Sequence, residues 1–330
     1  MPTTMRDVAR KAGVSIKTVS RVVNDQGEIS NETRQRILGV INDLGYRPNL
    51  IARGLVTQRT RTIGLVVGDI TNPFFPEVAR GVQDVARTRD YNVFLCNSDE
   101  NQQEELRALY SLAGQGVDGI IIFPCYQTGD NLNTFADQYR PIVAINHLCQ
   151  HPNIGMVLTE NEQGARLAVE HLVRKGHRQI GMLAGLEISS QRGRRVRGFL
   201  EALAAHGLPV IGPRVLARLP TLESGYEGAL RLLTQDLQIT AIVAYNDLIA
   251  LGAVRACQTL GRRVPDDCAI VGFDDIQLAS LVMPPLTTIR IDKYRLGQQA
   301  MTRVLEMLDQ PEEIFPPLRL DVELIVRASA

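Results

Sequence analysis

The chain has 330 residues, of which 45% are hydrophobic and 22% charged, a composition that suits about two globular domains. It excludes a fully disordered, collagen-like or wholly coiled-coil protein. No apolar run approaches the length of about 18 residues that suggests a membrane span, and residues 1–13 are too charged for a secretory signal. We therefore expect a cytoplasmic protein whose five scattered cysteines are buried, reduced thiols: Cys96, Cys125, Cys149, Cys257 and Cys268.

The formal net charge of zero hides an uneven distribution of charge. Residues 1–61 hold 11 Lys and Arg but only 5 Asp and Glu, a net charge of +6, so the remainder carries −6. A basic module joined to an acidic body is typical of a protein whose module meets a polyanion. On charge alone, a chance fluctuation on a solvated surface remains an alternative.

The N-terminal module begins with two predicted helices separated by a tight turn. Thr4 and Asp7 have the spacing of a capping box at the start of the first helix. Gly13 can supply the turn, and Ser15 can cap a second helix over residues 16–23. A third helix begins near Ser30. Its apolar side chains have helical spacing: Ile37, Val40, Ile41 and Leu44. The pattern predicts a small all-α unit with a helix-turn-helix at its front.

The exposed side of the second helix suits the major groove of DNA. Ile16 offers an apolar group for a thymine methyl, Lys17 and Arg21 are cations, and Thr18 and Ser20 carry hydroxyls. Short polar side chains near the helix ends are candidate phosphate ligands: Thr4, Ser15 and Asn24. The alternative is a bundle whose polar face is only solvated.

The linker after this module predicts a marginal helix. Pro48 can begin it and Asn49 can cap it, but about two turns are too short to be stable alone in water. Gly54 weakens it by a further ~1 kcal/mol relative to Ala. We expect a segment that is helical only when held. A plain tether, in which Leu55 packs on the body, is the alternative.

The remaining residues alternate short apolar runs with helix-length segments, which predicts a parallel α/β architecture of two doubly wound lobes. Runs without polar alternation indicate strands buried on both faces. The expected strands are 62–68, 91–97, 118–124, 141–146, 154–159, 179–185, 241–246 and 268–274. The expected helices include 76–90, 102–115, 161–176 and 247–262.

Polar and aromatic residues recur at the carboxyl ends of these strands, where open α/β sheets bind ligands. Amides and carboxylates can bind vicinal hydroxyls, and an aromatic ring can cover the apolar face of a sugar. Each residue could instead serve a loop or a turn. The residues concerned are Asn72, Phe74, Phe75, Cys125, Tyr126, Asn146, Asn246, Asp247, Asp274 and Asp275.

The runs "TMRDVARKAGVSIKTVSRVVND" and "ISNETRQRILGVINDLGYRPNLIARGL" resemble the DNA-binding headpiece of the lactose-repressor/galactose-repressor (LacI/GalR) family, and the likeness continues to the C-terminus. The resemblance implies a headpiece at 1–47, a hinge helix and linker at 48–61, and a core at 62–330 that is similar to periplasmic sugar-binding proteins. The implied lobes are 62–160 with 291–322, and 161–290 with 323–330.

The family further implies a homodimer on palindromic operator DNA, with Leu55 as a wedge in the minor groove and surfaces 76–90 and 275–285 between the subunits. A tetramer is not expected, because the C-terminus lacks a leucine-heptad helix. The implied effector residues are Asn72, Phe74, Phe75, Arg195, Asn246 and Asp274, together with Asn146 at a position where an acidic residue is common. Further departures from the family pattern are Gly193, Pro220-Thr221 and Glu160.

The effector expected from these residues is a sugar or a sugar acid, because Arg195 is compatible with a carboxylate or phosphate; a purine is less favoured. We expect no enzymatic activity, cofactor or metal, since nucleotide-binding glycine motifs, a GxSxG elbow and HExxH are absent from the sequence. His147 and His151 lie in a loop-like run, which argues against a zinc site there. Adjacent Asp274 and Asp275 should point to opposite faces of a strand, which argues against a shared acid-base site. A periplasmic binding protein would carry a signal peptide and no helix-turn-helix.

Overall fold

The computed structural model describes residues 3–23, 27–47, 59–125, 130–186, 190–209 and 212–330. The predicted phosphate ligand Asn24, the wedge residue Leu55 and the strand-end residue Tyr126 lie outside the described residues. The chain forms two compact units, Met1–Thr60 and Arg61–Ala330. No helix of the described residues is long and apolar enough to cross a membrane.

The first unit contains three helices, α1 (Met5–Ala12), α2 (Ile16–Val23) and α3 (Asn31–Asp43). The predicted capping box forms, because Thr4 and Asp7 bond to each other's backbone N–H. Gly13 adopts a left-handed φ of 67°, a conformation that costs glycine little, and ends α1. The Ser15 hydroxyl accepts the Thr18 N–H at 3.1 Å and so caps α2. The core of this unit is Val8, Ala9, Ala12, Val19, Val22, Ile37 and Tyr46.

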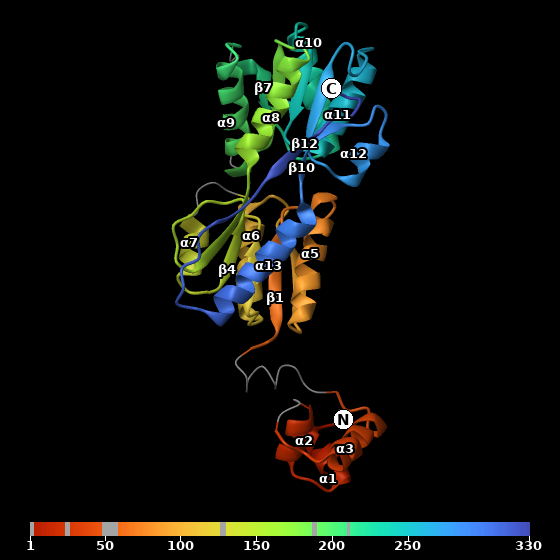
Figure 1. The fold of residues 1–330 in the computed structure, drawn as a ribbon, viewed down its shortest axis with the longest axis vertical. Helices are drawn as coiled ribbons and strands as arrows, with labels where there is room; N and C mark the ends of the chain where they lie inside the picture. The colour runs from red at the N-terminus through yellow and green to blue at the C-terminus, as the bar shows by residue number, and fades with distance from the viewer. Residues whose placement is uncertain (1–2, 24–26, 48–58, 126–129, 187–189, 210–211) are drawn as a thin grey trace. The chain divides into compact units, whose positions relative to one another are not determined.

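The second unit contains two six-stranded sheets, each with helices on both faces (Figure 1). The first sheet has the order β11-β5-β4-β3-β1-β2, and all its strands are parallel. Its strands are β1 (Thr62–Val67), β2 (Asn92–Asn97), β3 (Gly119–Ile122), β4 (Ile142–Ile145), β5 (Ile154–Thr159) and β11 (Leu318–Leu320). Its helices are α5 (Phe74–Thr88), α6 (Gln102–Gly114), α7 (Asp130–Ala136) and α13 (Lys293–Asp309). Together they form the first lobe.

The second sheet has the order β12-β10-β9-β8-β6-β7, and only β12 is antiparallel to its neighbour. Its strands are β6 (Ile180–Ala184), β7 (Val215–Ala217), β8 (Ala241–Ala244), β9 (Ala269–Asp274), β10 (Thr287–Ile291) and β12 (Val322–Ile325). Its helices are α8 (Asn161–Arg174), α9 (Ser190–Ala205), α10 (Leu222–Gln235), α11 (Asp247–Thr259) and the short α12 (Gln277–Leu281), with a 3-10 turn at Gly212–Arg214. These elements form the second lobe.

The chain passes between the lobes three times, each time through a single residue. Glu160 joins β5 to α8, Asp292 joins β10 to α13, and Asp321 joins β11 to β12. These points lie close to the expected crossovers at 160, 290 and 323. Figure 1 shows the result for α13, drawn in blue because it comes late in the chain, which packs beside α5 in the first lobe.

The apolar runs predicted eight strands and missed four: β7, β10, β11 and β12. The strands β10, β11 and β12 include the charged side chains Arg290, Arg319 and Glu323, so they form no continuous apolar run. The strand β7 is apolar but has only three residues, too few to stand out as a run. The expectation that the predicted strands are buried on both faces is wrong for β2. This strand is at the sheet edge, and Phe94 and Leu95 are 46% and 42% exposed.

The cysteine prediction also needs correction. Cys125, Cys257 and Cys268 are buried, but Cys96 and Cys149 are only partly so. Cys96 is on the edge strand β2, and Cys149 lies in the loop after β4, so neither is covered on all sides.

Candidate functional site

The structure places all five predicted groove residues on the first turns of α2. Ile16 is 45% exposed although it is apolar, and Lys17 and Arg21 are exposed on the same side. Thr18 and Ser20 are partly buried, and the Thr18 hydroxyl lies 2.8 Å from that of Ser15. The opposite side of the helix packs into the core through Val19 and Val22. The helix therefore has one face fixed by packing and one open to a partner.

The two described phosphate candidates lie at helix N-termini, where backbone N–H groups favour anions. Ser15 precedes α2 and is exposed. Thr4 precedes α1, and its hydroxyl donates to Asp7 at 2.6 Å. Hydrogen bonds from Thr4 lower the pKa of Asp7. The negative charge of Asp7 makes Ser15 the better phosphate candidate of the two.

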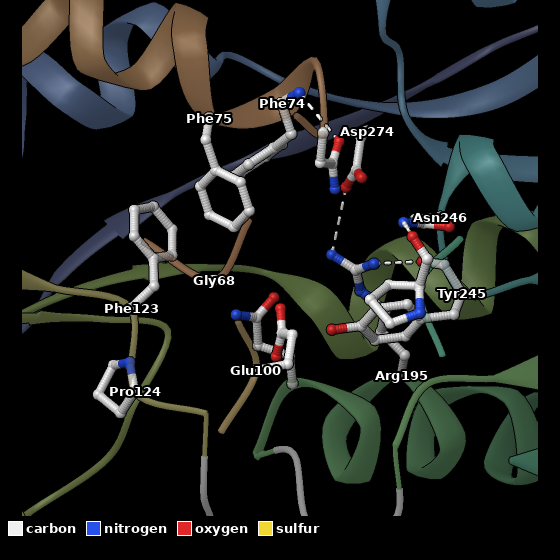
Figure 2. Close-up of a pocket in the computed structure, with 13 residues that line it drawn as sticks. Gly68, Phe74, Phe75, Glu100, Phe123, Pro124, Arg195, Tyr245, Asn246 and Asp274 are labelled. Carbon is white, nitrogen blue, oxygen red and sulfur yellow. Dashed lines mark hydrogen bonds and ion pairs between the residues drawn. The ribbon is translucent and has the colours of Figure 1, made fainter. Parts of the chain in front are cut away.

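A cleft opens between the lobes at the carboxyl ends of their strands and encloses about 510 Å³, part of it continuous with solvent (Figure 2). The first lobe supplies the loop after β1, the start of α5 and the loops after β2 and β3. The second lobe supplies α9, the residues after β7 and β8, and the end of β9. The lining residues are Gly68, Asn72, Phe74, Phe75, Glu100, Phe123, Pro124, Gln191, Arg195, Pro220, Tyr245, Asn246 and Asp274.

The wall from the first lobe is mainly aromatic. Phe74, Phe75 and Phe123 pack edge to face, with ring centroids 5.1–5.9 Å apart. Phe74 and Phe75 begin α5, and Asn72 orders this start because its carboxamide oxygen accepts the Phe74 N–H at 3.1 Å. Such rings offer an apolar surface to a ligand.

The wall from the second lobe centres on Arg195, which is 2% exposed. Its guanidinium group lies over the rings of Phe273 and Tyr245, 3.7 and 4.6 Å from the centroids. Its Nε donates to Asn161 Oδ1 at 2.7 Å, Nη1 donates to the Tyr245 carbonyl, and Nη2 lies 3.4 Å from Asp274 Oδ1. Packing and hydrogen bonds therefore fix the orientation of this group.

Asp274 ends β9 and is buried, with a φ of 112° that aspartate rarely adopts. Burial raises the pKa of its carboxyl group to about 6, although the nearby Arg195 and Lys293 oppose the shift. Asp275 is held elsewhere, by Arg290 at 2.8 Å and Arg327 at 2.7 Å. Burial opposes the change, but these hydrogen bonds lower the pKa of Asp275.

Asn246 both lines the cleft and serves the local backbone. Its Oδ1 accepts the Ile249 N–H at 2.9 Å and caps α11, and its Nδ2 donates to the Pro220 carbonyl at 3.3 Å. Asn246 and Asn72 therefore each do two things: they hydrogen-bond the local backbone, and they line the cleft.

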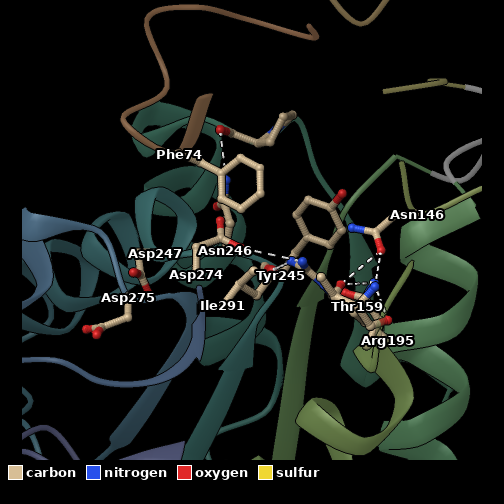
Figure 3. A network of polar contacts seen from close by, with 12 residues as sticks. Phe74, Asn146, Thr159, Arg195, Tyr245, Asn246, Asp247, Asp274, Asp275 and Ile291 are labelled. Carbon is tan, nitrogen blue, oxygen red and sulfur yellow. Dashed lines mark hydrogen bonds and ion pairs between the residues drawn. The ribbon is translucent and has the colours of Figure 1, made fainter. Parts of the chain in front are cut away.

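The structure does not bring Asn146 into the cleft. This residue is 1% exposed, and its Oδ1 accepts the Thr159 N–H at 2.7 Å and the Thr159 hydroxyl at 2.9 Å. Thr159 Oγ1 in turn accepts from Asn161, which accepts from Arg195 (Figure 3). Asn146 therefore lies at the far end of a polar network from Arg195. An amide serves this network because it accepts hydrogen bonds without adding a buried charge.

Other strand-end residues also differ from expectation. Cys125 does not line the cleft; its N–H and thiol donate to Glu105 Oε2 at 2.8 and 2.7 Å. Sequence reasoning missed Phe123, Pro124 and Tyr245, although the same strand-end rule could have found them. It also missed Glu100, which lies in a polar run three residues beyond β2 where no pattern distinguishes it.

The described residues contain no group of three or more His, Cys, Asp or Glu side chains placed to hold a metal ion. His151 lies 3.1 Å from Asp137 through Nε2, and its Nδ1 accepts the Asn153 N–H at 3.2 Å. His147 is buried, and its pKa is lowered by burial and by the nearby Arg194.

Comparison with known proteins agrees with this architecture. Residues 4–49 match a family model described as bacterial regulatory proteins, lacI family, and residues 60–325 match one described as periplasmic binding proteins and sugar binding domain of LacI family. Catabolite control protein A of Priestia megaterium is 38% identical over 311 residues, 94% of each chain.

Two solved structures are also similar. The Lac repressor dimer bound to operator and the anti-inducer ONPF has a TM-score of 0.90 and 30% identity, covering 100% of this chain and 99% of that one. A LacI family regulator from Enterococcus faecium with bound ribose has a TM-score of 0.73 and 30% identity, covering 81% of this chain and 98% of that one.

A helix-turn-helix unit followed by a two-lobed core with an interlobe cleft defines a DNA-binding transcriptional regulator, and not an enzyme. The chain belongs to the LacI family of bacterial regulatory proteins, whose members include repressors such as the Lac repressor. The family resemblance and the two-part fold expected from the sequence are therefore confirmed.

Proposed function

We propose that this protein is a dimeric cytoplasmic repressor of carbohydrate genes, which binds a palindromic operator and changes its DNA affinity when a sugar occupies the interlobe cleft. The observation that carries the proposal is the cleft itself: one aromatic wall and one wall of fixed polar groups, contributed by different lobes. A ligand that contacts both walls favours one angle between the lobes.

Operator recognition is assigned to α2. Lys17 and Arg21 are exposed cations next to the exposed Ile16, a combination that suits guanine edges and thymine methyl groups. Two-fold pairing of headpieces would place two copies of α2 in successive major grooves, which is why the expected operator is a palindrome.

Dimerisation is assigned to the two predicted surfaces. The first predicted surface, 76–90, covers most of α5. The edge strand β2, which lies next to α5, exposes Phe94 and Leu95. In the range 275–285, Leu278, Leu281 and Met283 are 44%, 70% and 80% exposed. Apolar side chains that gather at a protein surface indicate a protein interface. The Lac repressor, which is similar over the whole chain, was solved as a dimer on its operator.

The sugar assignment follows from the chemistry of the lining. Phe74, Phe75 and Phe123 can cover an apolar sugar face, while Asp274 and Arg195 can bind hydroxyls. The similar regulator from Enterococcus faecium contains bound ribose.

Residues of the cleft are hydrogen-bonded to residues at the crossovers, which suggests how ligand binding changes the affinity for DNA. Arg195 bonds Asn161, the residue after the Glu160 crossover. Lys293, the residue after the Asp292 crossover, donates to the carbonyls of Asp274 and Asp275 at 2.9 Å. A change in lobe angle would alter the spacing of the two linkers and hence the pairing of the hinge helices, with Leu55 as the wedge between base pairs.

The test is direct. Duplexes selected from a random pool by the full-length protein should contain a palindrome, and light scattering should give the mass of a dimer. Adding neutral sugars one at a time should change operator affinity for at least one of them. Selection of no duplex would reject DNA recognition, whereas a palindrome whose binding no sugar changes would reject only the sugar assignment.

A further inference from the structure

One acidic side chain that lines the cleft, Glu100, takes no part in the hydrogen bonds that hold Arg195. Glu100 follows β2 and reaches the cleft lining from a loop in which Asp99 and Glu100 both have left-handed φ angles, 51° and 52°. Its carboxyl group packs so closely on Gly68 that any larger residue there would clash with Glu100 Oε1. Figure 2 shows this group directed into the space between the aromatic rings and Arg195.

The surroundings of Glu100 contain negative rather than positive charge. Burial raises the pKa of Glu100, and the nearby Glu105 of α6 and Asp69 of the loop after β1 raise it further, to about 7. The uncharged Gly68, which follows β1, lies against the Glu100 carboxyl group, and the ring of Phe75 from α5 also lies next to Gly68. Within the described part of the chain, no hydrogen bond or ion pair to the Glu100 side chain is formed.

The one cation of the described lining cannot serve an anionic ligand well. Arg195 is paired with Asp274, and its remaining bonds go to Asn161 and the Tyr245 carbonyl. With all three ionised, Glu100, Arg195 and Asp274 leave the lining with a net charge of −1. An anionic ligand would therefore meet the unpaired Glu100 carboxylate in a partly desolvated cleft, where charge repulsion is strong.

We propose that Glu100 selects uncharged sugars for this cleft and excludes sugar acids and sugar phosphates. The proposal rests on the sugar-sensing function proposed above and decides between the two effector classes that the sequence left open. A hydroxyl group can donate to the Glu100 carboxylate, whereas a carboxylate or phosphate can only repel it. At a separation of about 6 Å and an effective dielectric constant of about 20, this repulsion corresponds to about 100-fold in affinity.

The experiment measures binding by calorimetry at pH 8, where Glu100 is ionised, using the full-length protein. The probes are matched pairs that differ in charge: ribose with ribose 5-phosphate, and glucose with glucose 6-phosphate and with gluconate. The wild type should bind at least one neutral sugar, and its charged partners about 100-fold more weakly. Glu100→Gln should reduce this ratio to tenfold or less, because it removes the charge and keeps the size.

A matched control separates the cleft charge from the overall charge. Glu104→Gln removes the same charge from the exposed start of α6, outside the cleft, and should leave the ratio unchanged. Tight binding of an anionic probe to the wild type, or an unchanged ratio in Glu100→Gln, would overturn the proposal alone. Failure of every probe to bind either protein would overturn this proposal together with the sugar assignment, while operator binding would still test DNA recognition.

Discussion

The headpiece and the core place their functional residues in different ways. The five groove residues of the headpiece lie within six positions of one helix, α2, and are directed outward by neighbours that pack inward. The lining of the cleft comes from seven separate segments of two lobes, and the chain between those lobes crosses three times. A helix displays its face through local periodicity, but a cleft exists only after distant segments have been brought together.

This difference separates two kinds of charge. The headpiece contributes a surface field, since residues 1–61 carry a net +6 and its described cations are mostly exposed. The cleft contains single charges whose pKa values are changed by burial, as at Asp274 and Glu100. Salt should strongly weaken binding that depends on the exposed charges of the headpiece, and should weaken binding that depends on the buried charges of the cleft much less.

The largest expected effect tests this contrast directly. If a dimer neutralises 6–10 phosphates, operator affinity should fall about 10³–10⁵-fold between 50 and 200 mM salt. Sugar binding, measured under the same conditions, should change only slightly. Fluorescence anisotropy of labelled operator and calorimetry of the sugar would measure the two quantities. Equal salt dependence for both ligands would contradict the contrast between surface and buried charge.

The next effect concerns the cleft. Asp274→Asn should weaken binding of the neutral sugar about 10–150-fold, because hydrogen bonds to a charged acceptor contribute about 1.5–3 kcal/mol. Operator affinity without sugar should be retained. Asp266→Asn, in which an exposed carboxylate of the same lobe is neutralised, is the control. Undiminished sugar binding by Asp274→Asn would remove this residue from the proposed site.

In the headpiece, Arg21→Ala should reduce the preference for the operator over unrelated duplexes about 10–100-fold, since a bidentate contact to a base contributes about 1–3 kcal/mol of discrimination. Arg36→Ala removes an equal charge from α3 and should leave the preference unchanged. Competition binding with both duplexes measures the ratio. A preference lost equally in both variants would show that charge alone, and not α2, carries recognition.

The smallest effect is on stability. The pKa of Glu100 is raised to about 7 in the folded protein from a usual value of 4.5, so its contribution to stability is fully present below 4.5 and is lost as the pH rises through 7. Glu100→Gln should therefore melt on the order of 2–4 °C higher than wild type at pH 8, with no difference near pH 4. Calorimetric melting at both pH values checks this, and Glu104→Gln should show no such gain.

Particular elements show how far sequence reasoning reached. It found α2 within its observed bounds, because the Gly13 turn, the Ser15 cap and the spacing of Val19 and Val22 are all local. It treated β2 as buried on both faces, because an apolar run is the same at the centre and the edge of a sheet.

In the candidate site, Asn72, Phe74, Phe75, Arg195, Asn246 and Asp274 were identified from strand ends and family likeness, and all line the cleft. Asn146 also ends a strand but bonds to Thr159 instead, since a strand-end position does not fix where the side chain points. Glu100 could not be predicted as a cleft residue from the sequence, because its position depends on contact with Gly68, some 30 residues earlier in the chain.

The sequence alone determined the three-helix headpiece, the alternation that builds parallel sheets and the family of the protein, because caps, turns and apolar periodicity act between near neighbours. Only the tertiary structure decided which strand forms an edge, which carboxylate meets Arg195 and which one stays unpaired in the cleft. Those outcomes depend on distances between segments that the chain brings together through Glu160, Asp292 and Asp321, and electrostatic and packing energies follow distance in space.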